Sequence, residues 1–289
     1  MVQYLAKRIG RSILTLFVIV TLVFCLLRLM PVEGYFANYE KMTEAQIQAG
    51  LQSMGLLDPL PVQIGHFWRD ALHGDLGVSH IYKLNAPVTR ILAQKLPISI
   101  EMGVLAMLLS LVLGIPLGLV MGRYKGRWPD KLIRGYCLVI SSTPAFWLAL
   151  LLLLIFSVWL GWLPIGLSVP IGVEESAVTW LDRLRHAILP ALTLSVTGVA
   201  NIALHTREKL VDVLSSDYVL LARARGESRR SLVLRHGLRN VALPALTLQF
   251  GSISEIIGGS VLVEQVFSYP GLGQAAVTAG LGSDLPLLL

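Results

Sequence analysis

The sequence predicts an all-α polytopic membrane protein, and three observations lead to this fold class. Hydrophobic residues make up 54% of the 289 residues, and the mean hydropathy is +0.68. Charged residues make up only 15%, whereas soluble domains carry about 25%. Several nearly uncharged segments reach the length of about 20 residues that crosses a bilayer as a helix. A chain of this composition belongs to the membrane class.

Five segments have the length and apolarity of membrane spans. In chain order they are residues 9–30, 102–122, a segment within 135–163, 187–206 and 241–263. The first follows a basic N-terminus, as in a signal peptide, but no small-x-small cleavage site follows it, so we expect a retained membrane helix. The chain ends on "DLPLLL", which resembles the first residues of a sixth span. We therefore expect about six transmembrane helices, the last truncated in this chain.

Lysine and arginine are distributed unevenly between the two sides that alternating spans define. Residues 1–12, 123–134 and 207–240 carry three, five and eight of them, sixteen in total. Residues 31–97 and 164–186, on the opposite side, carry seven, against nine Asp and Glu. Because cytoplasmic loops carry an excess of Lys and Arg, the N-terminus and the segment 207–240 are predicted to be cytoplasmic.

Residues 31–97 form a long external connection between the first two predicted spans. The segment is too long for a plain connector and contains the turn signals "LLDPLP" and "HGDLG". We expect a small, partly helical folded unit on the outer face. The predicted organisation is an N-terminal helix (1–30), this external region, and a core of transmembrane helices (98–289).

Motifs of several enzyme and metal-binding classes are absent. The sequence has no G-x-x-x-x-G-K-[ST] phosphate loop, no H-E-x-x-H and no G-x-S-x-G. Cys25 and Cys137 lie in apolar runs and are expected to be buried thiols rather than a disulfide. Three histidines recur at intervals of seven, but glycines interrupt any helix that would align them. Surface histidines are therefore favoured over metal ligands at His66, His73 and His80, and no catalytic or metal-binding residue is predicted.

Glu255 lies about fourteen residues into the fifth predicted span. Intramembrane acids are energetically costly and tend to face a cavity or a partner, and small neighbours allow close helix packing or a bent backbone. Ser252, Glu255, Gly258 and Gly259 are therefore candidate residues lining a pathway. The alternative is that Glu255 lies near the outer interface and meets water; both interpretations stay open at this point.

Residues 223–240, "RARGESRRSLVLRHGLRN", are strongly basic, with six arginines. Gly226 offers a break or a left-handed position and Ser228 a helix N-cap, which predicts two short helices. On the second helix Leu234, Leu238 and Val241 form an apolar stripe. Four arginines are expected on its polar side: Arg229, Arg230, Arg235 and Arg239.

Three kinds of partner could explain this basic segment. Nucleic acid fits poorly, because Tyr218 is the only nearby aromatic residue and the segment is tethered to a membrane. A helix lying on the lipid surface and a helix docking into a cytoplasmic partner protein both remain open.

The segment resembles the EAA loop of ABC importer membrane subunits, whose pattern is E-A-A-x3-G, about nine residues, then I-x-L-P. Ala222, Gly226 and Pro244 match it, Val241 stands for the isoleucine, and leucines occupy the first two positions. The form "ARARG", together with "GLLDPLPVQ", "GDLGVS" and "SVLVEQVFSYPGLGQ", is similar to the peptide and nickel importers. Tyr269 stands where Trp or Leu is more usual. The resemblance covers nearly the whole chain.

The resemblance implies a permease subunit of a dipeptide, oligopeptide or nickel importer, with the importer permease fold, in the bacterial cytoplasmic (inner) membrane. The implied partners are a second homologous permease, two ATP-binding cassette ATPases, an extracytoplasmic substrate-binding protein and membrane lipids. ATP and Mg would bind to the ATPases, so no cofactor and no catalytic residue is implied for this chain. A coupling loop at about 209–240 would dock on an ATPase. Its residues would be Ala222, Arg223, Gly226, Ser228, Arg229, Arg230, Leu234, His236, Asn240 and Pro244.

The cargo is the least determined part of this prediction. Peptides are the commonest cargo that the resemblance implies, and nickel or a metal chelate is the alternative. A stand-alone channel or secondary transporter would not need an ATPase-docking loop. A membrane enzyme would need a nucleophile or metal constellation within the spans, and the sequence shows none.

Overall fold

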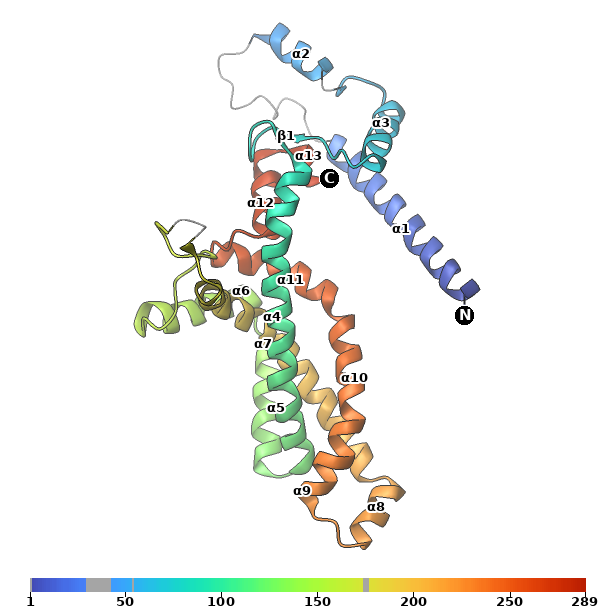
Figure 1. Ribbon diagram of the computed structural model, residues 1–289, viewed down its shortest axis with the longest axis vertical. Coiled ribbons are helices and arrows are strands. Elements are labelled where there is room, and N and C mark those ends of the chain that lie inside the picture. Colours follow the sequence, from blue (N-terminus) through green and yellow to red (C-terminus); the bar gives the residue numbers. More distant parts are fainter. Residues whose placement is uncertain (1, 30–42, 54, 174–176) are drawn as a thin grey trace. The chain divides into compact units, whose positions relative to one another are not determined.

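The computed structural model describes residues 2–29, 43–53, 55–173 and 177–289. The chain divides into two compact units, one formed by residues 1–94 with 275–289 and the other by residues 95–274. The sequence-based boundaries placed 275–289 with the transmembrane core. Helices dominate both units (Figure 1).

The first unit contains the helices α1 (Val2–Arg28), α2 (Glu44–Ser53), α3 (Leu60–Leu72) and α13 (Leu285–Leu288). The strands β1 (Val78–Ser79) and β2 (Ala86–Pro87) pair antiparallel as a small hairpin. Part of the predicted external region is therefore helical; its residues 31–42 and 54 lie outside the described ones. The short helix α13 falls on "DLPLLL", where the sequence predicted the start of a sixth span.

Aromatic side chains join α1 to α3 inside the first unit. Phe17 stacks on Trp68 with ring centroids 4.7 Å apart, and the Trp68 indole N–H donates to the Thr21 hydroxyl at 3.0 Å. Phe24 and Phe67 form a second ring pair at 5.1 Å. Aromatic pairs of this kind add specific geometry to apolar burial, so they fix α3 against one face of α1.

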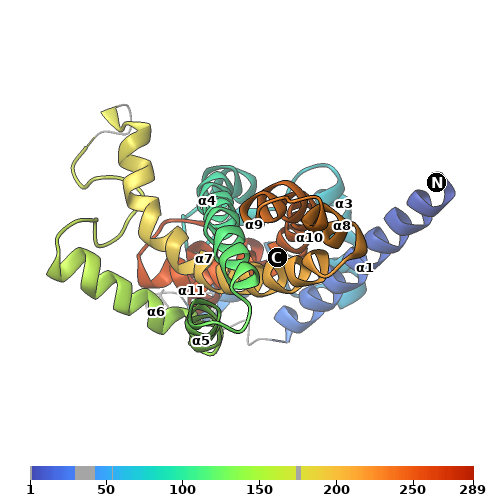
Figure 2. The same ribbon diagram turned by 90° about the horizontal axis from the view of Figure 1, so that it is seen from below.

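The second unit is built from long helices, beginning with α4 (Val88–Arg123), α5 (Trp128–Ser141), α6 (Ala145–Leu152) and the π-helical segment η2 (Leu153–Trp159). After α7 (Trp180–Leu214) come α8 (Asp217–Ala224), α9 (Arg229–Ser231), the π-helical segment η4 (Leu232–Gly237), α10 (Leu238–Gly251) and α11 (Ile253–Val266). Helix α12 (Leu272–Gly282) begins at the end of this unit, and most of its residues belong to the first unit. Figure 2 looks along this group and shows α4, α5, α7 and α10 as neighbours, with α6 leaving sideways.

The predicted spans correspond to helices of the structure. Among the described residues, three helices are long and apolar enough to cross a membrane (Gln3–Arg28, Val88–Arg123 and Trp180–Leu214), and up to five if two bent helix pairs each count as one span. The pairs are Trp128–Ser141 with Ala145–Trp159, bent by 108°, and Arg229–Gly251 with Ile253–Val266, bent by 54°. These elements coincide with the five predicted segments, so the all-α polytopic class is confirmed.

The 108° bend of the third predicted span occurs at Pro144, which begins α6 as its N-cap. Proline cannot donate a backbone hydrogen bond and disfavours helical backbone in the residue before it. The hydroxyls of Ser142 and Thr143 donate to the carbonyls of Leu138 and Val139, at 3.0 and 2.8 Å. They thus bind carbonyls in the last turn of α5.

Helix α7 lies in the core of the second unit and approaches α4 closely. A row of glycines on α4, every four residues, faces α7: a Cβ at Gly118 would lie 2.5 Å from the Thr206 Cβ, and Gly114 and Gly122 meet Ile202 and Leu210 at 2.9 and 2.7 Å. Small residues at intervals of four let helix backbones approach in membrane proteins. The apolar core around α7 includes Met121, Cys137 and Ala203, all fully buried.

Candidate functional site

The basic segment folds as the sequence predicts, as two helices joined at Gly226. Helix α8 ends at Ala224, and Gly226 has a φ of +89°, a left-handed conformation that favours glycine. The space around it is open, so the requirement is conformational rather than steric. Ser228 caps the next helix, its side chain accepting a hydrogen bond from the Ser231 backbone N–H at 3.3 Å. Both predicted local features are confirmed.

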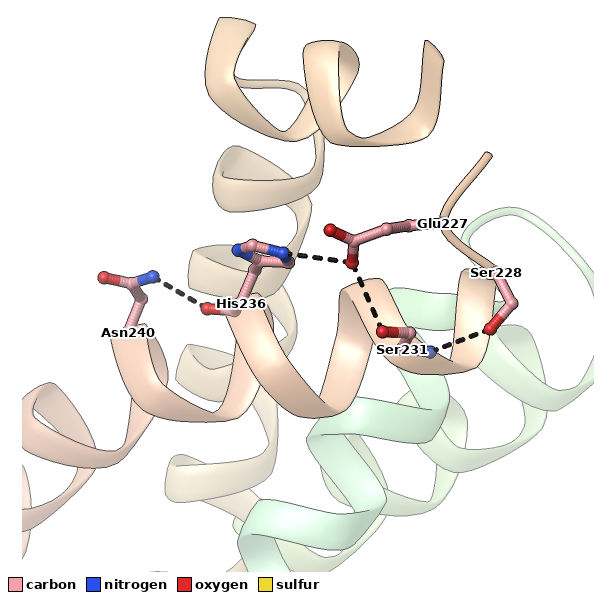
Figure 3. Close-up of polar contacts among 5 residues, drawn as sticks. All are labelled: Glu227, Ser228, Ser231, His236 and Asn240. Carbon is pink, nitrogen blue, oxygen red and sulfur yellow. Dashed lines mark hydrogen bonds and ion pairs between the residues drawn. The ribbon is translucent and has the colours of Figure 1, made fainter. Parts of the chain in front are cut away.

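A polar network holds the turn between these two helices closed (Figure 3). One carboxylate oxygen of Glu227 contacts the Ser231 hydroxyl and the His236 Nε2, each at 3.2 Å. The Asn240 side-chain amide donates to the His236 carbonyl at 2.7 Å and to the Tyr218 hydroxyl at 3.3 Å. Because Tyr218 lies on α8, the network connects both helices and makes the segment one folded element.

An apolar layer lies under the network. Val219 and Ala222 of α8 form a buried cluster with Leu232, and Val233 and Val241 form another with Leu210 of α7. At Gly237 a Cβ would clash with Leu210 Cδ1, so no side chain larger than hydrogen fits there without a shift. Ala222, which matches the family motif, is therefore an anchor for α8 rather than a surface residue.

Only one of the three residues of the predicted apolar stripe is buried. Val241 is buried, but Leu234 and Leu238 are 49% and 36% exposed. The π-helical turn Leu232–Gly237 explains the difference, because it holds more residues per turn than an α-helix and shifts the face that points inward. The buried positions recur instead every four residues, at Val233, Gly237, Val241, Ala245 and Gln249.

All six arginines of the segment are exposed, as predicted for those on the second helix: Arg223, Arg225, Arg229, Arg230, Arg235 and Arg239. Leu234 and Leu238 are exposed on the same second helix. The outer surface of the segment therefore combines positive charge with large apolar side chains. Pro244, also predicted as part of the coupling loop, lies inside α10.

A second feature of the unit is a cavity of about 510 Å³ beside the break between α10 and α11. Ser252 lies at the break, and Glu255 is in the first turn of α11, where the helix dipole favours a negative charge. Ser252, Glu255 and Gly259 line the cavity, whereas Gly258 does not. Three of the four predicted pathway residues are thus brought together.

The sequence prediction missed the polar face that α7 presents to this cavity. Thr197, Asn201 and His205 line it at intervals of four residues, a spacing that puts them on one face of a helix. Gln249 of α10 lines it too and is only 2% exposed. For α7, three polar residues at intervals of four inside an apolar span could have predicted a polar face. For Gln249, the sequence contains no comparable pattern.

A second cavity, of about 370 Å³, continues from the first in the direction of the basic segment. The two share His205, Thr247 and Leu248, and the second extends to Lys209 and Pro244. Cavities therefore follow the α7–α10 pair from the helix break to the neighbourhood of the basic segment. Across the described parts of the chain, no group of three or more His, Cys, Asp or Glu side chains is arranged to hold a metal ion.

Comparison with known proteins gives a consistent result. Residues 114–289 match the family model described as "Binding-protein-dependent transport system inner membrane component". The chain is 38% identical to a glutathione transport system permease protein, GsiC, of Pectobacterium atrosepticum, and 34% identical to a putative peptide transport system permease protein of Brucella abortus. It is 35% identical to GsiC of Escherichia coli. Each alignment covers all of this chain and 90% of the relative.

These matches agree with the helical architecture and the membrane-spanning candidates, and they place the protein among transport components rather than enzymes. Nickel does not occur in the names of these three relatives, whereas peptide and glutathione do. The chain belongs to the binding-protein-dependent transport system inner membrane components, as an ABC importer permease of the peptide subfamily.

Proposed function

We propose that this protein forms half of the translocation pathway of an ATP-driven peptide importer and is coupled to an ATPase through the segment 217–240. The observation that carries this proposal is the structure of the segment itself. It is a folded element with an apolar underside on α7 and an outer surface of six arginines and four exposed leucines, Leu220, Leu221, Leu234 and Leu238. Such a surface suits a partner protein with an acidic, partly apolar groove.

The assembly that we propose has a second, homologous permease, two ATPases that bind ATP and Mg, and a substrate-binding protein. This chain lies in the cytoplasmic membrane with its N-terminus and the segment 217–240 in the cytoplasm, which follows the excess of Lys and Arg on that side. The relatives named for peptide and glutathione transport support a peptide cargo over nickel.

The rigid connection between the segment and the cavities supports a coupling role. The helix from Arg229 to Gly251 is uninterrupted up to the 54° bend, and the cavity residues Gln249, Ser252 and Glu255 lie at that bend. Displacement of the segment by an ATPase would move the helix as a unit. The movement would then reach the cavity without unfolding any intervening turn.

Charge reversal on the outer surface tests docking. Arg229→Glu with Arg230→Glu should abolish co-purification of the ATPase and lower transport at least tenfold, because it reverses the charge that the proposed acidic groove binds. Both side chains are exposed, so no buried contact is lost and the fold should persist. Lys125→Glu with Arg127→Glu is the matched control, with the same charge change at exposed residues outside the segment. Gly226→Pro should also disrupt coupling, since proline cannot adopt a φ of +89°. Unchanged ATPase association in all these variants would refute the docking proposal.

A further inference from the structure

The cavity at the α10–α11 break contains polar side chains of two kinds. The hydroxyls of Ser110, Thr193 and Thr247 donate to carbonyls within their own helices, at 2.9, 2.9 and 3.0 Å, so those hydrogens are used. In contrast, both side-chain polar atoms of Gln249 are buried without a hydrogen-bond partner, and the side chains of Asn201, His205 and Glu255 form no hydrogen bond or ion pair with any residue that the structure describes. Two amides, an imidazole and a carboxylate are therefore free to bind something else.

Gln249 is the most informative of the four. Its side chain is 2% exposed, and neither its Oε1 nor its Nε2 has a hydrogen-bond partner among the described residues. A buried amide without partners destabilises a fold. Neighbouring residues on the same inward face are apolar or glycine (Val241, Ala245 and Gly237), so an apolar side chain would satisfy packing at this position. The amide therefore needs an explanation outside the fold of this chain.

The chemistry of the four groups defines the occupant. A primary amide both donates and accepts hydrogen bonds, which matches a peptide group with its own N–H and C=O. The Glu255 carboxylate, in a cavity lined by no Lys or Arg among the described residues, matches an ammonium group. Lys209 lines only the second cavity, beyond His205. A cation-binding end and an anion-binding end thus lie at opposite ends of the connected cavities.

The distance along α7 from Asn201 to Lys209 gives a minimum length for an occupant that contacts both residues. Residues 201 to 209 cover eight steps of the helix, about 12 Å at 1.5 Å per residue. An extended chain covers at most about 3.3–3.6 Å per residue, so three to four residues cover this length. The first cavity, about 510 Å³, lies in the range of cavities that bind small molecules.

We propose that the cavity is a peptide-recognition site within the pathway, in which the Gln249 amide pairs with a peptide group of a short substrate and the Glu255 carboxylate binds its free amino terminus. Asn201 and His205 contact the same substrate, with its carboxylate directed towards Lys209. This inference rests on the proposed importer function and adds a second point of selection, inside the membrane, to that function.

Gln249→Leu is the decisive variant, because leucine fills a similar volume without polar atoms. If Gln249 serves only packing, the variant should be as stable as the wild type or more stable, with normal transport. We instead expect at least a tenfold lower uptake of labelled tripeptides, with glutathione and trialanine as the two probes, by the complete transporter in proteoliposomes. The unfolding temperature should not fall and the ATPase should still co-purify, while the stimulation of ATP hydrolysis by peptide is lost.

Glu255→Gln tests the amino-terminal contact, and Ser254→Ala is its control, since Ser254 is an exposed neighbour on α11 that does not line the cavity. Glu255→Gln should raise the peptide concentration for half-maximal uptake at least tenfold, and Ser254→Ala should leave it unchanged. Uptake within twofold of wild type in both Gln249→Leu and Glu255→Gln would overturn the recognition site. Failure of the wild-type chain to bind an ATPase or to transport either probe would instead refute the proposed importer function.

Discussion

Arg207 of α7 binds Asp130 of α5 through two parallel hydrogen bonds, Nε to Oδ1 at 2.5 Å and Nη2 to Oδ2 at 2.8 Å. The backbone N–H of Gly126, in the loop after α4, donates to the same Oδ2 at 2.8 Å. The two side chains are only 19% and 4% exposed. One carboxylate therefore joins the loop after α4, helix α5 and helix α7 of the second unit, on the side that the charge distribution predicts to be cytoplasmic.

Removing one partner of this pair should be strongly destabilising. Asp130→Asn leaves the Arg207 charge buried without its counter-ion, and breaking a buried pair in this way costs about 3–5 kcal/mol. The double variant Asp130→Asn, Arg207→Gln should recover part of the loss, because no unpaired charge remains. Chemical unfolding of the detergent-purified protein measures both. Equal loss in the single and the double variant would contradict a paired role.

The glycine row on α4 should not tolerate larger residues. Gly118→Val would place a Cβ 2.5 Å from the Thr206 Cβ and 2.6 Å from the Ala203 carbonyl oxygen. Overpacking of this kind costs about 1–3 kcal/mol, and here it should also separate α4 from α7. Gly135→Ala on α5 is the control, because no atom lies within 4 Å of the place that its methyl group would take. Thermal unfolding should show a clear drop for Gly118→Val alone.

Gly226→Ala should loosen the turn between α8 and α9. Alanine at a φ of +89° is strained, and left-handed backbone costs an L-residue about 1–2 kcal/mol. Gly226→Asn should be milder, since asparagine visits this region more readily. Protease cleavage between Arg223 and Arg230 measures the opening of the turn, with Gly251→Ala as a control at a glycine of ordinary φ and open surroundings. Similar cleavage of Gly226→Ala and wild type would argue against a conformational need for glycine.

Asp284 gives the first unit a specific dependence on pH. Burial raises the pKa of this carboxyl, but hydrogen bonds from the Ser79 hydroxyl and the N–H groups of Tyr82, Ile81 and His80 lower it, and the net pKa lies below the ordinary value of 3.8. Because the folded-state pKa is depressed, the carboxylate stabilises the unit above the unfolded pKa, and this contribution is lost as pH falls through the folded pKa.

Asp284→Asn should therefore lower the unfolding temperature at pH 7, where the wild-type carboxylate is charged. The difference between variant and wild type should shrink as the pH falls below about 4, the ordinary pKa of aspartate. Thermal unfolding measured from pH 7 to pH 3 checks this. A difference that stays constant over the whole range would show that the hydrogen-bonded charge does not stabilise the unit.

Local chemistry explains which parts of the structure could be predicted from the sequence. The left-handed turn at Gly226 and the cap at Ser228 depend on one or two neighbouring residues, so their residue types suffice. The apolar segments depend on composition over about 20 residues, and they correspond to helices or bent helix pairs. The 108° bend before α6 follows from the backbone restriction at Pro144, but a proline alone does not determine the angle.

Features that depend on packing could not be predicted in this way. The inward face of the helix that follows Ser228 depends on the π-helical turn Leu232–Gly237, and that turn lies against Leu210 of α7. The periodicity of an ideal helix therefore could not show that Leu234 and Leu238 lie on the exposed side. In the sequence, Gln249 is one isolated polar residue in an apolar stretch, and nothing around it distinguishes it from other such residues. Its importance appears only when its burial, its missing partners among the described residues and the cavity are seen together.

In the proposed coupling, the uninterrupted helix from Arg229 to Gly251 moves as a rigid rod. Its 23 residues correspond to a length of about 34 Å. By simple geometry, a tilt of about 5° at the arginine-bearing end moves the far end by about 3 Å, on the order of a hydrogen-bond length. A displacement of that size is enough to form or break a hydrogen bond at Gln249. Under the proposed coupling, a small displacement of the outer surface would therefore change the contacts between the cavity and its occupant.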